Sequence, residues 1–179
     1  MTFQLNRFIE VVHGLIGKDT IEPILTGLPA YESLTTPVQR ARWIHDLMDN
    51  LVNAAGVDQA KTVMTVCGQQ CIGKSLLVKA RKLKTEAQDL NELIDTLNES
   101  RIGGGKLVRK EDLIYASYAR CYCGSVSKTI QPISPIYCQC SCGWYQKLFE
   151  TLFDKPVRVE LVDSIIHGAD ACRFIIHTA

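Results

Sequence analysis

The sequence contains eight cysteines, and their spacing is the strongest chemical signal in the chain. Two lie four residues apart in a predicted helix and therefore share one face of it. Two more are separated by one residue in a β-like run, so their side chains point to the same side. Three others alternate at the start of a predicted helix, and the last opens the final β-like run. In order along the chain they are Cys67, Cys71, Cys121, Cys123, Cys138, Cys140, Cys142 and Cys172.

Thiolates from these groups suit a soft metal site, because sulfur ligands select zinc and iron–sulfur clusters. A tetrahedral zinc ion or a cluster takes up to four cysteine ligands. The expected ligands are a subset of Cys67, Cys71, Cys121, Cys123, Cys138, Cys140 and Cys142. The spacing is not that of a standard zinc finger or ribbon, so buried thiols that pack as small apolar side chains remain the alternative.

Cys142 is the cysteine that best fits a catalytic nucleophile. It falls in the first turn of a helix predicted over residues 141–153, where the helix dipole lowers the pKa of a thiol. Such a nucleophile needs a base, and His167 and His177 are the candidates in the C-terminal part of the chain. This pattern supports one alternative function, a cysteine- or metal-dependent hydrolase of a small heterocyclic or amide substrate.

Aromatic side chains cluster around the cysteines in the sequence. Rings with polar tips suit a pocket for a small molecule, and the predicted ligand-binding residues are Tyr122, Tyr137 and Trp144. Any one of these rings could instead pack a helix on a sheet. The leading hypothesis is a small-molecule-binding or sensing protein with a cysteine-lined pocket that could also bind a metal ion.

A further alternative is nucleotide binding through the segment from Gly68 to Ser75, which matches the phosphate-loop pattern G-x4-G-K-[ST]. In such a loop, backbone N–H groups surround the phosphates, Lys74 reaches them and Ser75 holds magnesium. The pattern requires a strand before it and a helix after it. Apolar residues before this segment recur at helical spacing instead, so a chance match in an interrupted helix is the competing interpretation.

Helical patterns dominate the first part of the chain. Residues 1–30 are weakly helical, and Thr36 followed by Pro37 predicts the start of a longer helix. Gly56 can end that helix, and further stretches with helical spacing follow. We therefore expect residues 1–102 to form a helical N-terminal portion.

Three consecutive glycines, Gly103 to Gly105, mark the best boundary in the chain. The chain beyond them predicts a β-β-α-β-β order, with segments at residues 106–109, 112–123, 141–153, 156–166 and 172–178. The predicted fold is α+β, with N-terminal helices packed with an antiparallel-sheet core at residues 103–179 in one compact unit.

Composition argues against several classes of protein. The 20 basic and 19 acidic residues give a net charge of +1, so we expect no nucleic-acid partner. No apolar run approaches the roughly 18 residues of a membrane span, and the N-terminus lacks the apolar region of a signal peptide. A cytoplasmic protein with reduced thiols is the expectation. The sequence leaves the oligomeric state open and allows a homodimer.

The C-terminal part carries a recognisable pattern in the run FETLFDKPVRVELVDSIIHGADACRFII. A helix precedes a strand with Glu160, and Ser164 precedes a hairpin with Gly168, Cys172 and Phe174. This resembles the end of the 4-vinyl-reductase-type small-molecule-binding domain and of the aminothiazoline-carboxylate hydrolase-like proteins. The segment YCQCSCGW, preceded by CYCG, resembles a cysteine-rich bacterial branch of that group. The resemblance implies an α+β fold and a ligand-sensing domain or a hydrolase, in some members with a cysteine-bound metal.

Overall fold

The computed structural model describes residues 3–126 and 133–178. Its α-helices are α1 (Leu5–Leu15), α2 (Ile21–Leu25), α3 (Pro37–Ala55), α4 (Val57–Cys71), α5 (Lys74–Glu86), α6 (Leu90–Glu99) and α7 (Gln139–Phe153). Its strands are β1 (Leu107–Lys110), β2 (Leu113–Tyr118), β3 (Arg158–Asp163) and β4 (Cys172–His177). Its short 3-10 turns are η1 (Lys18–Thr20), η2 (Tyr31–Ser33), η3 (Ile102–Gly105), η4 (Pro135–Cys138) and η5 (Ile165–His167). None of the helices in these ranges is both long and apolar enough to cross a lipid bilayer.

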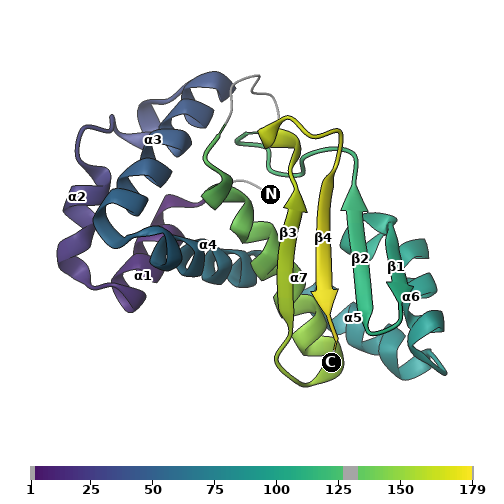
Figure 1. Ribbon diagram of the computed structural model, residues 1–179. Coiled ribbons are helices and arrows are strands. Elements are labelled where there is room, and N and C mark those ends of the chain that lie inside the picture. Colours follow the sequence, from purple (N-terminus) through teal and green to yellow (C-terminus); the bar gives the residue numbers. More distant parts are fainter. Residues whose placement is uncertain (1–2, 127–132, 179) are drawn as a thin grey trace.

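Helices and strands occupy separate parts of the molecule (Figure 1). The four strands form one antiparallel sheet in the order β1-β2-β4-β3. Helices α5, α6 and α7 cover one face of this sheet, and α1 to α4 form a helical half beside it. This arrangement confirms the predicted α+β fold, with N-terminal helices and a C-terminal β-β-α-β-β core.

Local sequence explains where α3 starts and stops. The side chain of Thr36 accepts a hydrogen bond from the N–H of Gln39, whose side chain accepts one from the N–H of Thr36. This capping box precedes Pro37, whose fixed φ suits the first helical position. Gly56 follows the helix with a φ of 80°, which glycine adopts at little cost, and the chain turns directly into α4. The predicted start and end of this helix are confirmed.

The strand β2 is shorter than predicted. It ends at Tyr118, so Cys121 and Cys123 lie beyond it and do not share one side of a strand. Tyr118 pairs with Cys172, the first residue of β4. Beyond Tyr118, β4 therefore offers β2 no further residue to pair with. The two cysteines pack against the helical half instead.

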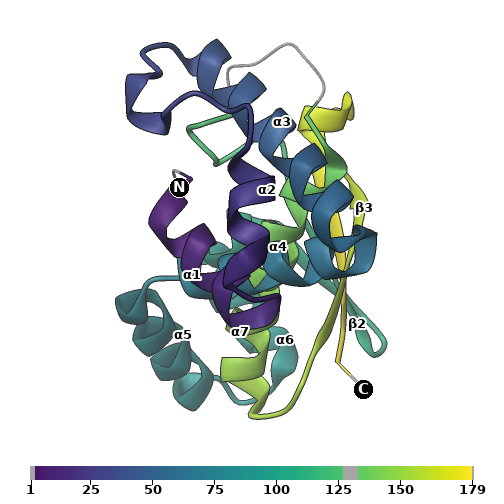
Figure 2. The same ribbon diagram turned by 90° about the vertical axis from the view of Figure 1, so that its left-hand side faces the viewer.

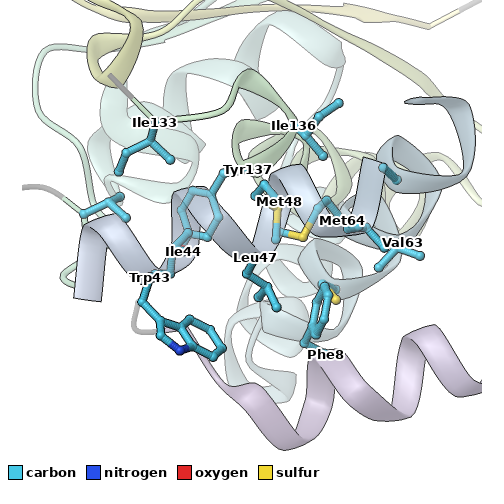
Figure 3. Close-up of a cluster of buried hydrophobic side chains, with 14 of the residues drawn as sticks. Phe8, Trp43, Ile44, Leu47, Met48, Val63, Met64, Ile133, Ile136 and Tyr137 are labelled. Atoms are coloured by element: carbon cyan, nitrogen blue, oxygen red, sulfur yellow. The ribbon is translucent and has the colours of Figure 1, made fainter. Parts of the chain in front are cut away.

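Two clusters of buried side chains form the core. The first joins α1, α3 and α4 to Val126, Ile133 and the η4 turn, as Figure 3 shows around Leu47 and Met64. The second joins α5, α6 and α7 to the inner face of the sheet. Both clusters contain residues from before and after Gly103, so the helical portion does not have a core of its own.

Candidate functional site

A pocket of about 440 Å³ lies where the helical half meets α7 and one end of the sheet. Side chains from α1, α4, the segment after β2, the start of α7 and the start of β4 build its wall. Seven of the eight cysteines line it, although they come from four separate stretches of the chain. They are Cys67, Cys71, Cys121, Cys123, Cys138, Cys140 and Cys172.

Two glycines allow α4 and α7 to cross in close contact. A Cβ atom added at Gly68 of α4 would lie 1.9 Å from the carbonyl oxygen of Cys140. A Cβ atom added at Gly143 of α7 would lie 1.8 Å from the carbonyl oxygen of Thr65. The two backbones therefore occupy the space that any larger residue would need. Both views show that α4 and α7 cross (Figures 1 and 2). The pocket wall near this crossing includes Cys67 and Cys71 of α4 and Cys140 of α7.

The same crossing explains why a glycine stands at position 68, the first residue of the segment that matches the phosphate-loop pattern. Gly68 lies inside α4, which continues to Cys71, and α5 begins at Lys74. A phosphate loop needs a strand followed by a loop that wraps the phosphates, whereas here a helix leads into the segment and only Ile72 and Gly73 separate it from the next helix. Gly68 is required for packing against α7. The segment therefore lacks the strand–loop–helix arrangement of a phosphate loop, and nucleotide binding between Gly68 and Ser75 stays a prediction from the sequence.

Hydrogen bonds to hydroxyl groups fix two of the sulfur atoms. The Sγ atom of Cys123 lies 2.7 Å from the hydroxyl of Tyr137. The Sγ atom of Cys138 lies 2.9 Å from the hydroxyl of Ser164, one of the residues in the C-terminal sequence pattern. Tyr137 lies 14 residues after Cys123 in the sequence, and Ser164 lies 26 residues after Cys138. The pocket wall is therefore held together by contacts between segments.

Burial raises the pKa of four of the lining thiols. It raises the pKa of Cys67 and of Cys138 to about 12 and the pKa of Cys121 to about 11. It also raises the pKa of Cys140 well above the ordinary value for a thiol, and neighbouring cysteines add to this effect. At neutral pH these thiols carry no charge, so they offer a polarisable surface to a ligand.

Cys142, the predicted nucleophile, does not line the pocket. It is buried in the second core cluster, beside residues of α7 and the sheet. The expected lowering of its pKa at the start of a helix is wrong, because burial raises the pKa of Cys142 to about 12. His167 and His177 do not line the pocket either. A catalytic role for Cys142 stays a prediction from the sequence.

The cysteines that line the pocket are not arranged as a formed metal centre. Within residues 3–126 and 133–178, no group of three or more Cys, His, Asp or Glu side chains is placed to hold a metal ion. Binding would also require thiolates, whereas burial favours the protonated form of several of these thiols. The predicted zinc ion or iron–sulfur cluster stays a prediction.

The three predicted ligand-binding aromatics all line the pocket, namely Tyr122, Tyr137 and Trp144. The sequence analysis did not single out three arginines that line it too. They are Arg7, Arg101 and Arg120. They lie in three separate segments with no shared spacing, so no sequence pattern could have grouped them.

Comparisons with known proteins identify the family to which the chain belongs. The phenol-responsive sensory domain of the transcription activator PoxR, solved with phenol, has a TM-score of 0.46 and 12% sequence identity, and the match covers 80% of this chain and 76% of that one. A likeness this low does not bear on function. No curated protein matches the chain. A family model described as "Family of unknown function (DUF6144)" matches residues 4–179, and the protein therefore belongs to this family.

Proposed function

We propose that this protein binds or senses a small organic molecule in the cysteine-lined pocket. The carrying observation is that a cavity of about 440 Å³ collects seven thiols and several aromatic rings from distant segments. A volume of this order and a largely apolar wall with a few polar groups are typical of small-molecule sites. The sequence resemblance to 4-vinyl-reductase-type binding domains supports the same proposal.

The chemistry of the wall favours a ligand with an aromatic or otherwise polarisable body. Protonated thiols are soft, weakly polar groups, and sulfur makes favourable contacts with ring edges. Tyr118 and Tyr145 satisfy their own hydroxyls, through Ser141 at 3.1 Å and the carbonyl of Gly103 at 2.9 Å. Their rings can therefore contact a ligand without leaving an unpaired polar group.

The two tryptophans provide a test with an internal control. Trp144 lines the pocket, whereas Trp43 is buried in the first core cluster, where its indole N–H donates to the carbonyl of Pro29 at 2.8 Å. In a ¹⁵N–¹H spectrum of the unmodified protein, titration with small aromatic compounds should shift the Trp144 indole peak saturably. The Trp43 peak should stay in place. Equal shifts of both peaks, or no saturable shift across the compounds, would contradict the proposal.

A cysteine-bound metal ion is a second proposal, favoured by the convergence of seven thiols on one wall. Elemental analysis of protein purified without oxygen tests it. About one zinc ion per chain, or iron with matching sulfide, supports a metal role. Metal-free protein that still binds aromatic compounds would leave the pocket as a ligand site only.

The remaining alternatives rest on the sequence. A hydrolase that uses Cys142 gains no support from the pocket, which that residue does not line. Rapid modification of one thiol by iodoacetamide near neutral pH would revive it. A homodimer and the lack of a nucleic-acid partner stay predictions.

A further inference from the structure

The charges on the pocket wall all have the same sign. Among the described residues that line it, the side chains charged at neutral pH are the guanidinium groups of Arg7, Arg101 and Arg120. Aspartate, glutamate, lysine and histidine are absent from that part of the lining. The wall thus presents positive charge next to neutral thiols and rings.

Arg7 has donors to spare. Its Nη1 atom donates to the Sγ atom of Cys71 at 3.2 Å, which is a weak acceptor for a guanidinium with five N–H groups. Within the described part of the chain, its guanidinium forms no ion pair with a carboxylate at 4.0 Å or less. Arg7 is half-buried on α1. A partly buried guanidinium without a counter-charge favours an incoming anion.

The other two arginines belong to the same arrangement. Arg120 places its guanidinium over the ring of Tyr122, 4.9 Å from the centroid. Arg101 has a left-handed backbone with a φ of 53°, just before the glycine turn whose Gly103 and Gly104 also line the pocket. Both arginines are exposed, so they mark the side of the pocket that faces solvent. Like Arg7, neither forms an ion pair with a carboxylate among the described residues.

Some arginines elsewhere on the surface do have acidic partners. Arg81 pairs with Asp154, Arg158 with Glu160, and Arg173 with two aspartates. The three pocket arginines share one cavity and form no ion pair with a carboxylate among the described residues.

We propose that the natural ligand is a small organic anion, with an aromatic or apolar body held among the thiols and rings and an acidic group facing the arginines. This inference rests on the proposed small-molecule function and names the ligand class. A carboxylate, an acidic phenol or a similar oxyanion has the acceptor geometry that guanidinium groups match. The apolar body would take the place of water against Trp144 and the thiols.

A pair of probes that differ in charge tests this inference. 2-Naphthoate and 2-naphthamide have the same naphthalene ring. The first carries a negatively charged carboxylate, and the second carries a neutral amide in its place. Binding of each is measured by calorimetry and by the Trp144 indole peak. We expect 2-naphthoate to bind about tenfold or more tightly than 2-naphthamide, with the difference shrinking at high salt.

Arginine variants assign the effect to the pocket. Arg7→Gln and Arg120→Gln should each weaken 2-naphthoate binding about fivefold to tenfold and leave 2-naphthamide binding unchanged, which also shows that the variant is folded. Arg42→Gln removes the same charge from an exposed position of α3 outside the pocket and should change neither. Equal affinities for the two probes in the unmodified protein overturn the inference and leave the small-molecule function intact. If neither probe binds saturably, both proposals fail.

Discussion

Burial suppresses the thiolate form of four lining thiols, Cys67, Cys121, Cys138 and Cys140, far below its level in a free cysteine. For Cys121, a pKa of about 11 leaves a thiolate fraction at pH 7 that is about 300-fold below that of a free thiol with a pKa of about 8.5. The thiolate is the nucleophile, so burial makes these cysteines slow to react even where they face a cavity. Their placement therefore favours contact with a ligand over covalent chemistry.

Alkylation at varied pH tests this view. With iodoacetamide, the rate at Cys121 and Cys138 should rise about tenfold for each pH unit from 7 to 10, because deprotonation is still incomplete there. Glutathione, as a free thiol, should level off near its own pKa. Mass spectrometry of digests taken over time gives each rate. A plateau at Cys121 or Cys138 below pH 9 would show a stabilised thiolate and would point to a bound metal or cation.

Among the secondary-structure elements, the crossing of α4 and α7 decides whether the pocket exists. Alanine normally favours a helix over glycine by up to about 1 kcal/mol. At Gly68 and Gly143 the added Cβ would overlap a carbonyl oxygen of the other helix, and backbone atoms cannot rotate away. The packing cost should therefore exceed the gain in propensity.

We predict opposite effects for alanine at matched glycines. Gly68→Ala and Gly143→Ala should each lower the free energy of unfolding by about 1–3 kcal/mol or more, because the helices must separate. Gly14→Ala, at an exposed position of α1 with nothing within 4 Å, should be neutral or stabilising by up to about 1 kcal/mol. Urea denaturation measures all three. Stabilisation at Gly68 would mean that α4 and α7 do not cross this closely.

The sequence predicted elements well and their assembly poorly. Thr36, Pro37 and Gly56 set a helix through local chemistry, so the sequence was enough to predict its ends. The end of β2 depends on where its partner β4 begins, which is a property of a distant segment. The sequence predicted a pocket lined by cysteines because it shows which residue types recur together. The three arginines in that pocket and the exclusion of Cys142 from it depend on how distant segments assemble, so the sequence could not predict them.

At the scale of the whole molecule, the buried thiols make the free energy of unfolding depend on pH in the alkaline range. Cys67, Cys138 and Cys142 have a pKa of about 12 in the folded chain, above the value of about 8.5 for an unfolded chain. A raised pKa stabilises the fold fully below pH 8.5, and this stability is lost as the pH rises toward 12.

Unfolding as a function of pH checks this linkage. The free energy of unfolding should fall between pH 9 and 11, by up to about 1.4 kcal/mol per pH unit for each such thiol. Cys142→Ala should make that fall less steep, since one titrating group is removed. Constant stability over this range would show that the thiols titrate alike in folded and unfolded chains.

The two core clusters share residues from both halves of the chain, so we predict a single unfolding transition that responds to a ligand as one unit. Trp43 reports on the first cluster, and Trp144 packs against the second and lines the pocket. With 2-naphthoate at a hundredfold excess over its Kd, the stabilisation is about 2.7 kcal/mol, which raises Tm by roughly 5–10 °C for a chain of this size. Thermal unfolding of the unmodified protein, followed at the indole ¹⁵N–¹H peaks of Trp43 and Trp144, should give coincident midpoints that shift together. Separate midpoints, with only the Trp144 transition shifted, would mean that the pocket belongs to the sheet half and that the helical half unfolds independently.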